Sequence, residues 1–249
     1  MNLSEFFKSN PKVALAFSGG VDSVYLLYAA VHSGAEIHAY YVKSAFQPQF
    51  ELDDARRAVK LLGADMTEIP VDVLSSKEIT CNPADRCYYC KKTIFSAITS
   101  KAEADGFSVL IDGTNASDDV QDRPGMRAIA ELSVRSPLRE CGLTKNEIRR
   151  LSRDAGLFTW DKPAYACLAT RIPTGMEITK DGLRRTEEAE SYLFSLGLAD
   201  FRVRTLGDCA RIQVQAAQLE FIIKNRQQIE SELKKSYSAV LLDMEVRSE

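Results

Sequence analysis

The sequence of 249 residues lacks the features that mark membrane and exported proteins. No stretch approaches the roughly 18–20 consecutive apolar residues that a membrane-spanning helix needs. The first residues, 1–5, do not begin the basic and then apolar pattern of a signal peptide. We therefore expect a cytoplasmic protein without a membrane partner.

An excess of basic residues is also missing, since 32 Lys and Arg stand against 35 Asp and Glu, for a net charge of -3. Proteins that bind nucleic-acid phosphates are usually strongly basic, so we expect no nucleic-acid partner, although a local basic pocket stays compatible with this balance. The 45% hydrophobic and 27% charged residues are typical of a globular protein. The length suits one large domain or two modest ones.

Histidine is scarce, with His32 and His38 alone, so a metal site would depend on sulfur or carboxylate ligands. Cysteine is not scarce, and a reducing cytosol opposes a disulfide framework. The six cysteines are therefore either buried apolar residues or participants in chemistry: Cys81, Cys87, Cys90, Cys141, Cys167 and Cys209.

Short β-rich runs alternate with helical periodicity in the first part of the chain. Strands are expected over 13–17, 36–42, 65–69 and 108–112, and helices over 22–32 and 50–62. Thr144 and Glu147 form a capping-box pattern that opens a further helix to about Ala155. Strands separated by helices predict an α/β fold with a doubly wound parallel sheet.

A loop-like segment with Pro163, Pro173 and Gly175 precedes a different pattern. Helices are expected over 181–196 and 216–233, and strands over 200–204, 210–214 and 238–242. We therefore predict one domain over 1–175 and a small α+β domain, for substrate binding and oligomerisation, over 176–249.

A glycine-containing string, SGGVDS, lies between the first expected strand and the first expected helix. Backbone N–H groups at such a junction point at an anion, and glycine permits close approach of the backbone. The string does not end in the Gly-Lys-Ser/Thr of a Walker motif. A plain glycine turn with Asp22 capping the helix is the alternative interpretation.

The whole string resembles the PP-loop of ATP pyrophosphatases. The resemblance implies that a substrate oxygen attacks the α-phosphate of ATP, that an adenylate forms and that pyrophosphate leaves. It assigns Mg²⁺ binding to Asp22, and stabilisation of the phosphates to the loop. The loop residues expected at the nucleotide are Ser18, Gly19, Gly20, Asp22 and Ser23.

The segment after the strand expected at 108–112 carries further polar residues. Because ligands bind beyond the carboxyl ends of parallel strands, we expect it to line the nucleotide site, although Asp and Asn clusters also commonly make turns. The residues concerned are Asp112, Thr114, Asn115 and Arg123.

Two cysteine-containing segments carry the remaining chemistry. Cys87 and Cys90 are spaced i and i+3, so they share one face if the segment is helical, and Lys91 beside them would favour thiolate character. A core pair, half a zinc site and a redox pair are alternative interpretations. Cys167 lies in a proline-bounded loop near Arg171, where thiolate chemistry is also plausible.

Four ordered motifs together, SGGVDS, DRCYYCKK, DGTNASDDVQDRPG and ACLATRIPTG, resemble the LarE family over essentially the whole chain. These enzymes are ATP-dependent sulfur transferases that take part in making the nickel-pincer nucleotide, the cofactor of lactate racemase. The resemblance implies that ATP adenylates the carboxylates of pyridinium-3,5-biscarboxylic acid mononucleotide. Sulfur then replaces AMP and gives thiocarboxylates. It also implies a homo-oligomer, such as a hexamer.

The source of the sulfur divides that family. One branch sacrifices a cysteine of its own chain, whereas another holds a 4Fe-4S cluster on three cysteines and delivers an extra sulfide from the open iron. In the sacrificial branch the donor thiol matches Ala166 of this chain, and cysteine is absent at the positions of Cys87 and Cys90. We therefore favour a cluster on Cys87, Cys90 and Cys167 over a sacrificial Cys167, with Cys81 as a possible fourth ligand of a closed metal site.

The resemblance also suggests substrate contacts. Arg202 and Arg204, at i and i+2 on an expected strand, share one face that is either a solvated charged strand or a substrate-phosphate site. Glu190 and Lys91 are expected near the substrate, and Arg171 near the carboxylate or adenylate at Cys167. The acidic companion that usually accompanies Glu190 is Gln213 here.

Two other enzymes fit parts of this pattern. A tRNA thiolation enzyme also couples a PP-loop to cysteines or a cluster, and an ammonia-using AMP-forming ligase of the NAD-synthetase type shares the PP-loop but needs no thiols. A nucleotide-binding or iron–sulfur scaffold without turnover is the alternative outside enzymes.

Overall fold

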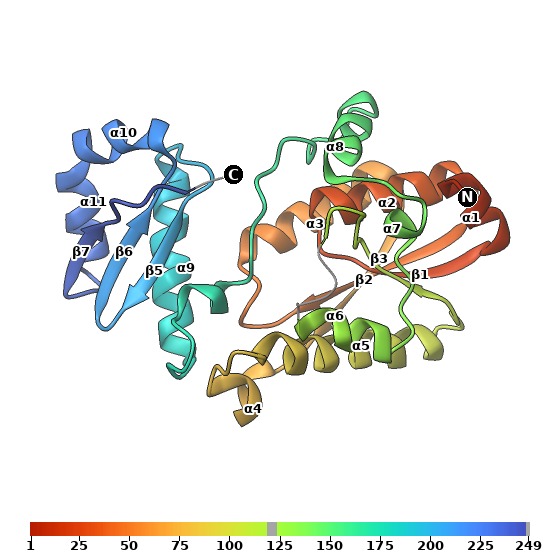
Figure 1. The fold of residues 1–249 in the computed structure, drawn as a ribbon, viewed down its shortest axis with the longest axis horizontal. Helices are drawn as coiled ribbons and strands as arrows, with labels where there is room; N and C mark the ends of the chain where they lie inside the picture. Colours follow the sequence, from red (N-terminus) through yellow and green to blue (C-terminus); the bar gives the residue numbers. More distant parts are fainter. Residues whose placement is uncertain (119–123, 248–249) are drawn as a thin grey trace. The chain divides into compact units, whose positions relative to one another are not determined.

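The computed structural model of the chain describes residues 1–118 and 124–247 (Figure 1). The described residues divide into two compact units. Unit 1 comprises Met1–Val73 and Asp85–Lys162, and unit 2 comprises Leu74–Ala84 and Pro163–Glu249.

Unit 1 contains, within the described residues, a sheet of four parallel strands in the order β3-β2-β1-β4. Leu15 in β1 pairs with Ala39 in β2 on one side and with Ile111 in β4 on the other. The strands are β1 (Lys12–Ala16), β2 (Glu36–Lys43), β3 (Asp65–Pro70) and β4 (Leu110–Ile111). The four predicted strands are thus confirmed, although β4 is shorter than expected.

Helices cover both faces of this sheet, with α2 and α3 on one side and α5 and α6 on the other (Figure 1). Val13 and Leu15 face a core shared with α2 and α3, whereas Ala14 between them faces Ile98 and Ala102 of α5. This burial of alternate residues on opposite faces is what a doubly covered parallel sheet requires. The helices of unit 1 are α1 (Leu3–Ser9), α2 (Val21–His32), α3 (Gln49–Leu62), α5 (Arg86–Ala104), α6 (Pro124–Glu131), α7 (Pro137–Glu140) and α8 (Lys145–Asp154).

Local sequence determines where α3 ends and where α8 begins. Gly63 ends α3 with φ 62°, a left-handed conformation that glycine adopts without a steric penalty. Thr144 accepts from the backbone of Glu147, and the Glu147 side chain accepts from the backbone of Thr144, which confirms the predicted capping box of α8.

Unit 2 has a smaller sheet, with the described strands in the order β5-β6-β7. β5 and β6 are antiparallel, and β6 and β7 are parallel. The elements are α4 (Lys77–Thr80), α9 (Lys180–Ser195), β5 (Arg202–Leu206), β6 (Cys209–Gln213), α10 (Leu219–Lys224), α11 (Arg226–Leu233) and β7 (Ala239–Leu242), with short 3₁₀ helices at Leu168–Arg171 and Ala216–Gln218. A further 3₁₀ helix, Val73–Ser75, spans the division between the units. α9 and α11 pack on the sheet through Leu193, Ile229 and Leu233.

The prediction of one helix over 216–233 is wrong in one respect, because the segment forms three separate pieces: a 3₁₀ helix, α10 and α11. Asn225 separates α10 from α11 with φ -99° and ψ 12°, outside the helical region. Its side-chain amide donates to the carbonyl of Phe221 at 2.8 Å, and so competes with continued helical hydrogen bonding.

The division between the units follows Lys162, whereas the sequence predicted a boundary after residue 175. The physical reason is a set of hydrogen bonds between residues 80–82 and 172–178, which places both segments in unit 2. Asn82 donates to the carbonyls of Ile172 and Pro173 at 3.3 and 2.8 Å. The Asn82 carbonyl accepts from Gly175, and the Thr80 carbonyl accepts from Ile178.

No helix of the described residues has the length and apolar character that a membrane crossing requires.

Replacing Asn82 by Ala should destabilise unit 2 by about 1–3 kcal/mol, because one buried and one partly buried carbonyl lose their donor. Asn82 is 1% exposed and has φ 54°. Ser133 has nearly the same φ, 53°, but an exposed side chain, so Ser133→Ala is a control for backbone strain alone. Thermal unfolding followed by circular dichroism should show a clear loss for Asn82→Ala. Equal melting temperatures for the two variants would contradict this account.

Candidate functional site

The SGGVDS loop connects β1 to α2, as the sequence predicts. Ser18 Oγ and Ser23 Oγ lie 3.0 Å apart, the Gly20 N–H donates to Ser18 Oγ, and Ser23 Oγ donates to the Gly20 carbonyl. Gly20 is the N-cap of α2, and among the described residues no side chain caps this helix start. The positive end of the α2 dipole is therefore directed at the loop, an arrangement that favours an anion.

Two glycines allow the backbone to pack closely around this loop. Gly19 has φ 71°, and a Cβ there would lie 3.0 Å from Ala55 of α3. Gly113, which follows β4, approaches the start of α2 so closely that a Cβ would lie 3.0 Å from the Ser23 nitrogen. The sequence did not single out Gly113, because the close approach depends on β4 lying beside β1.

Asp112 organises the segment after β4. Its carboxylate accepts from Thr114 Oγ1 at 2.6 Å, from the Thr114 N–H at 3.2 Å and from Ser136 Oγ at 2.7 Å. Asp112 is 5% exposed. These contacts give Asp112 and Thr114 a part in shaping the loop, and direct contact with a nucleotide stays a prediction for both.

Asp22, the second residue of α2, lies at the centre of a polar group. Lys145 Nζ is 2.6 Å from its carboxylate, and Asn115 Nδ2 is 3.4 Å from the other oxygen. The Asn115 N–H donates to Asp118 at 3.0 Å. The structure thus brings together Asp22 and Asn115, as expected, and adds Lys145 and Asp118, which the sequence did not indicate.

Burial raises the pKa of Asp22, and the negative charge of Asp118 acts in the same direction. Lys145 opposes both, through its charge and its hydrogen bond. Asp22 is therefore held in a partly desolvated position, where a cation would be favoured. Arg123, the remaining residue predicted at the nucleotide, lies outside the described residues.

Cys87 and Cys90 lie near the start of α5, which confirms that their segment is helical. Cys87 is exposed and Cys90 is half-buried. A guanidinium nitrogen of Arg86 lies 3.9 Å from Cys87 Sγ. The Lys91 side chain packs over Gly125 of α6, where a Cβ would lie 2.8 Å from Lys91 Cδ. A substrate contact by Lys91 stays a prediction.

Cys167 belongs to unit 2, where it precedes the 3₁₀ helix Leu168–Arg171 and is half-buried. Its carbonyl accepts from the Thr170 N–H at 3.0 Å and from Thr170 Oγ1 at 2.8 Å. The three cysteines predicted as cluster ligands are thus divided between the two units. Residues 1–118 and 124–247 contain no group of three or more His, Cys, Asp or Glu side chains that could hold a metal ion. Ligation of a cluster by these cysteines therefore stays a prediction.

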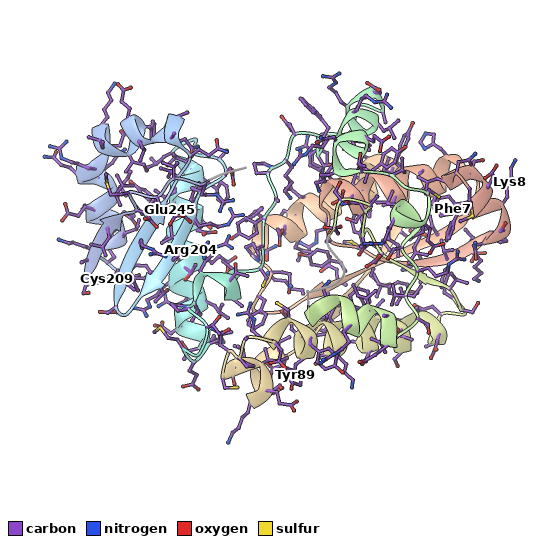
Figure 2. The ribbon with its side chains drawn as sticks, viewed as in Figure 1. Phe7, Lys8, Tyr89, Arg204, Cys209 and Glu245 are labelled. Atoms are coloured by element: carbon purple, nitrogen blue, oxygen red, sulfur yellow. The ribbon has the colours of Figure 1, made fainter. Side chains whose placement is uncertain are left out.

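Arg202 and Arg204 both lie on β5, as predicted, and Arg204 is labelled in Figure 2. Arg202 donates to the carbonyls of Phe201 and Ala164, both at 2.6 Å, and is 5% exposed. Burial, together with the charge of Arg171, lowers the pKa of Arg202 to about 10. Arg204 donates to the Thr170 carbonyl at 3.1 Å. These contacts fix the protein backbone, and a substrate-phosphate contact stays a prediction.

Arg171 and Glu190 form a buried bidentate pair, with each residue 1% exposed. Nε of Arg171 lies 2.8 Å from one carboxylate oxygen, and Nη2 lies 3.1 Å from the other. Burial disfavours the charged guanidinium, but the hydrogen bonds and charge of Glu190 outweigh burial and raise the pKa of Arg171. Removing one member of such a pair typically costs about 3–5 kcal/mol. Their contacts with adenylate and substrate stay predictions, and the geometry observed is that of an internal support.

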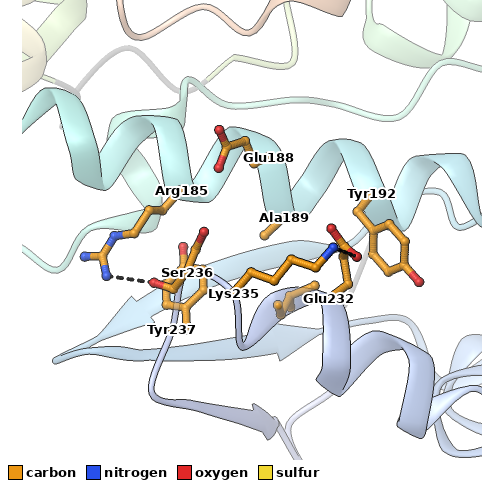
Figure 3. Close-up of a pocket in the computed structure, with 9 residues that line it drawn as sticks. Arg185, Glu188, Ala189, Tyr192, Glu232, Lys235, Ser236 and Tyr237 are labelled. Carbon is orange, nitrogen blue, oxygen red and sulfur yellow. Dashed lines mark hydrogen bonds and ion pairs between the residues drawn. The ribbon is translucent and has the colours of Figure 1, made fainter.

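A surface pocket of about 200 Å³ lies on another part of unit 2 (Figure 3). Residues from α9, from the end of α11 and from the segment between α11 and β7 line it, among them Arg185, Tyr192 and Tyr237. Arg185 lies at one end of it and donates to the Ser236 carbonyl at 3.0 Å. None of the residues that the sequence predicted as site residues lines this pocket.

Comparison with known proteins supports the interpretation that this protein is an enzyme. No model of a protein family matches the chain. The chain is 36% identical to an uncharacterized protein of Synechocystis sp., over 90% of this chain and 84% of that protein. It is 34% identical to the pyridinium-3,5-bisthiocarboxylic acid mononucleotide synthase of Lactiplantibacillus plantarum, over 88% of this chain and 80% of that protein. It is 25% identical to a probable tRNA sulfurtransferase of Acetivibrio thermocellus, over 74% of this chain and 50% of that protein.

An α/β unit with an anion-directed loop, together with relatives named as a synthase and a sulfurtransferase, defines an enzyme of the sulfur-transferase class. Within that class, the identity to the Lactiplantibacillus synthase and the coverage of both chains show that the protein belongs to the LarE family.

Replacing Asp22 by Asn should raise the melting temperature of the ligand-free protein at neutral pH. The pKa of Asp22 in the folded state lies above its ordinary value of 3.8. The stability that this group contributes is therefore present below the unfolded-state pKa, and it is lost as the pH rises through the folded-state pKa. The gap between the variant and the natural protein should widen as the pH rises from about 4, measured by calorimetry with EDTA.

Lys145→Met is the matched control, because it removes the cation that opposes the desolvation of Asp22. This variant should have a lower melting temperature than the natural protein at neutral pH. A lower melting temperature for Asp22→Asn than for the natural protein at pH 7 would refute the assignment of Asp22 as an electrostatically unfavourable group.

Proposed function

We propose that the protein is an ATP-dependent, AMP-forming sulfurtransferase that acts on pyridinium-3,5-biscarboxylic acid mononucleotide in nickel-pincer cofactor biosynthesis. The observation that carries the proposal is the SGGVDS loop at the β1–α2 junction, with Asp22 held beside Asn115 and Lys145. Family membership supports the choice of substrate. The fold of unit 1 is then that of a PP-loop ATP pyrophosphatase.

In the first half-reaction the loop would hold the phosphates of ATP. A substrate carboxylate oxygen attacks the α-phosphate, the bond between the α- and β-phosphates breaks, and pyrophosphate leaves with an acyl-adenylate formed. Ser18, Ser23 and the N–H groups at the start of α2 would bind the departing phosphates. As the nucleotide enters, the Lys145 ammonium would move from Asp22 and form an ion pair with a phosphate oxygen.

The polar group at the start of α2 suits Mg²⁺. The ion prefers oxygen ligands and usually binds one or two carboxylates together with substrate phosphates. Asp22 and Asp118 would supply the carboxylates, and Asn115 contacts both of them. When bound, Mg²⁺ would neutralise the charge that develops on the departing pyrophosphate.

In the second half-reaction sulfur replaces AMP on the activated carboxylate and leaves a thiocarboxylate. Repetition on the second carboxylate gives the bisthio product. The sulfur comes either through a 4Fe-4S cluster on Cys87, Cys90 and Cys167 or from Cys167 itself. Thiolates are the ligands that such clusters take, so the donor set fits the group in its chemistry, and three-cysteine ligation leaves one iron open.

The partners expected for this function are a small nucleotide substrate and further copies of the same chain. Exposed apolar residues of unit 2, among them Ile223, Leu241 and Met244, are consistent with a homo-oligomer, for which a hexamer is proposed. The location proposed is the cytoplasm.

A tRNA thiolation enzyme is the second candidate, on the basis of the tRNA sulfurtransferase relative. That relative is about twice as long as the part matched by this chain. Tight binding of bulk tRNA at physiological salt, in a gel-shift assay, would favour this function over the first.

Two variants separate the half-reactions. Asp22→Ala should lose ATP-dependent pyrophosphate release by about 100-fold or more, since removal of one electrostatic contact to a transition state commonly costs this much. Cys167→Ala should keep pyrophosphate release and lose thiocarboxylate formation. The assay is pyrophosphate release with the pyridinium dicarboxylate, together with mass spectrometry of the product. Loss of both activities in a folded Cys167→Ala protein would mean that Cys167 is structural.

Iron and acid-labile sulfide decide between the two sulfur sources. In protein purified and reconstituted without oxygen, a cluster should be lost in Cys87→Ala, Cys90→Ala and Cys167→Ala, and kept in Cys81→Ala. Visible absorption and metal analysis report this result. If the natural protein binds no cluster, a loss of about 34 Da from the chain after one turnover, as cysteine becomes dehydroalanine, would identify Cys167 as the donor. If all three alanine variants convert the adenylated substrate to final product as fast as the natural protein does, the reaction needs no thiol, which would instead favour an ammonia-using ligase.

A further inference from the structure

The segment that carries Cys167 is held by guanidinium groups at several of its backbone carbonyls. These contacts come from the sheet of unit 2 and from the 3₁₀ helix that follows Cys167. They are Arg202 to the carbonyl of Ala164 at 2.6 Å, Arg171 to the carbonyl of Ala166 at 3.0 Å, and Arg204 to the carbonyl of Thr170 at 3.1 Å. A loop would otherwise leave these carbonyls to water.

Both peptide groups that flank Cys167 are fixed by these and neighbouring contacts. The peptide between Ala166 and Cys167 is held through its carbonyl by Arg171 Nη1. The peptide after Cys167 is held through its carbonyl by the N–H and Oγ1 of Thr170. Because each peptide group is planar, the backbone on either side of Cys167 is fixed. The thiol can then move only about its χ1 torsion.

Arg171 is itself oriented by Glu190. Among the described residues, the Glu190 carboxylate accepts from Arg171 Nε and Nη2, from the Val203 N–H at 2.9 Å and from the Tyr165 hydroxyl. The Tyr165 ring lies 4.5 Å from the guanidinium carbon of Arg171 and 5.1 Å from that of Arg202. Glu190 thus connects α9 and β5 to the segment that carries the thiol.

We propose that Glu190 is a positioning residue for the Cys167 thiol, acting through Arg171, and that the Tyr165 hydroxyl completes this support. The inference rests on the proposed function, because it assigns the geometry of the residue that delivers or holds the sulfur. The bidentate geometry matters more than the charge, since a planar guanidinium held at two points fixes the direction of its third nitrogen. That third nitrogen, Nη1, holds Ala166 and Thr170.

Two variants remove parts of this support, and each has a matched control. Tyr165→Phe removes one hydroxyl and keeps the ring between the two guanidiniums, so it tests the proposal even where Glu190→Gln does not fold. Glu188→Gln is the control for Glu190→Gln. Glu188 lies on the same helix and also binds an arginine, Arg184, at 2.8 and 2.9 Å, but it is 52% exposed. Tyr192 lies on α9, as Glu188 does. Tyr192→Phe is the control for Tyr165→Phe, because it also removes one tyrosine hydroxyl.

The first measurement is the rate at which iodoacetamide alkylates Cys167, followed by peptide mass spectrometry with Cys209 as the internal reference. Tyr165→Phe and Glu190→Gln should raise the Cys167 rate about 3- to 10-fold and leave Cys209 unchanged, because the segment opens locally. The second is the amount of thiocarboxylate formed per pyrophosphate released. This ratio should fall about 10- to 100-fold, since misplacement of a reacting group by about 1 Å costs this much.

Unchanged alkylation and an unchanged product ratio in both folded variants would overturn the proposal. Equal changes at Cys167 and Cys209 would also overturn it, because they would report general loosening of unit 2. If the natural protein releases no pyrophosphate with the pyridinium dicarboxylate, the proposed function fails. The alkylation measurement then still decides whether Glu190 positions Cys167.

Discussion

The common direction of the strands in unit 1 is the constraint on which its candidate site depends. Parallel strands end at the same edge of the sheet, so the segments that follow β1 and β4 lie together although about one hundred residues separate them. Gly113 permits this approach, since a side chain there would meet the backbone of Ser23. The contacts of Asp22 with Asn115 and Lys145 all follow from this arrangement.

Unit 2 depends on a different interaction, the buried pair of Arg171 and Glu190. Two charges with 1% exposure are costly to desolvate, and the pair is stable only because each further polar atom finds a partner. The Glu190 carboxylate accepts hydrogen bonds from the Val203 N–H and the Tyr165 hydroxyl. Arg171 donates to the Ala166 carbonyl and to Thr170 Oγ1. An apolar core could stabilise the same elements, but it would not fix the direction of a loop backbone.

The residues proposed for activation lie in unit 1, whereas those proposed for sulfur delivery are divided between the two units. The loop at the start of α2, which suits phosphates, belongs to unit 1 together with Cys87 and Cys90, whereas Cys167 and the arginines belong to unit 2. The two units also differ in how they hold their polar groups. Asp22 keeps partial contact with solvent and would exchange partners when a ligand binds, whereas Glu190 is enclosed and keeps its partners. Activation would thus use a site that can rearrange, whereas the segment that carries Cys167 is held rigid.

Local patterns in the chain were enough to predict the strands of unit 1 and the capping box of α8, because the period of apolar residues and the capping residues act within a few residues. The motifs that mark the family were equally accessible, since they are strings of adjacent residues. Lys145, Asp118 and Gly113 at the loop were not predictable in this way, and neither was Glu190 as the partner of Arg171. Those contacts join residues far apart in the sequence, and no local pattern encodes them. They arise only in the folded chain, because burial and the pairing of strands choose which polar groups must satisfy one another.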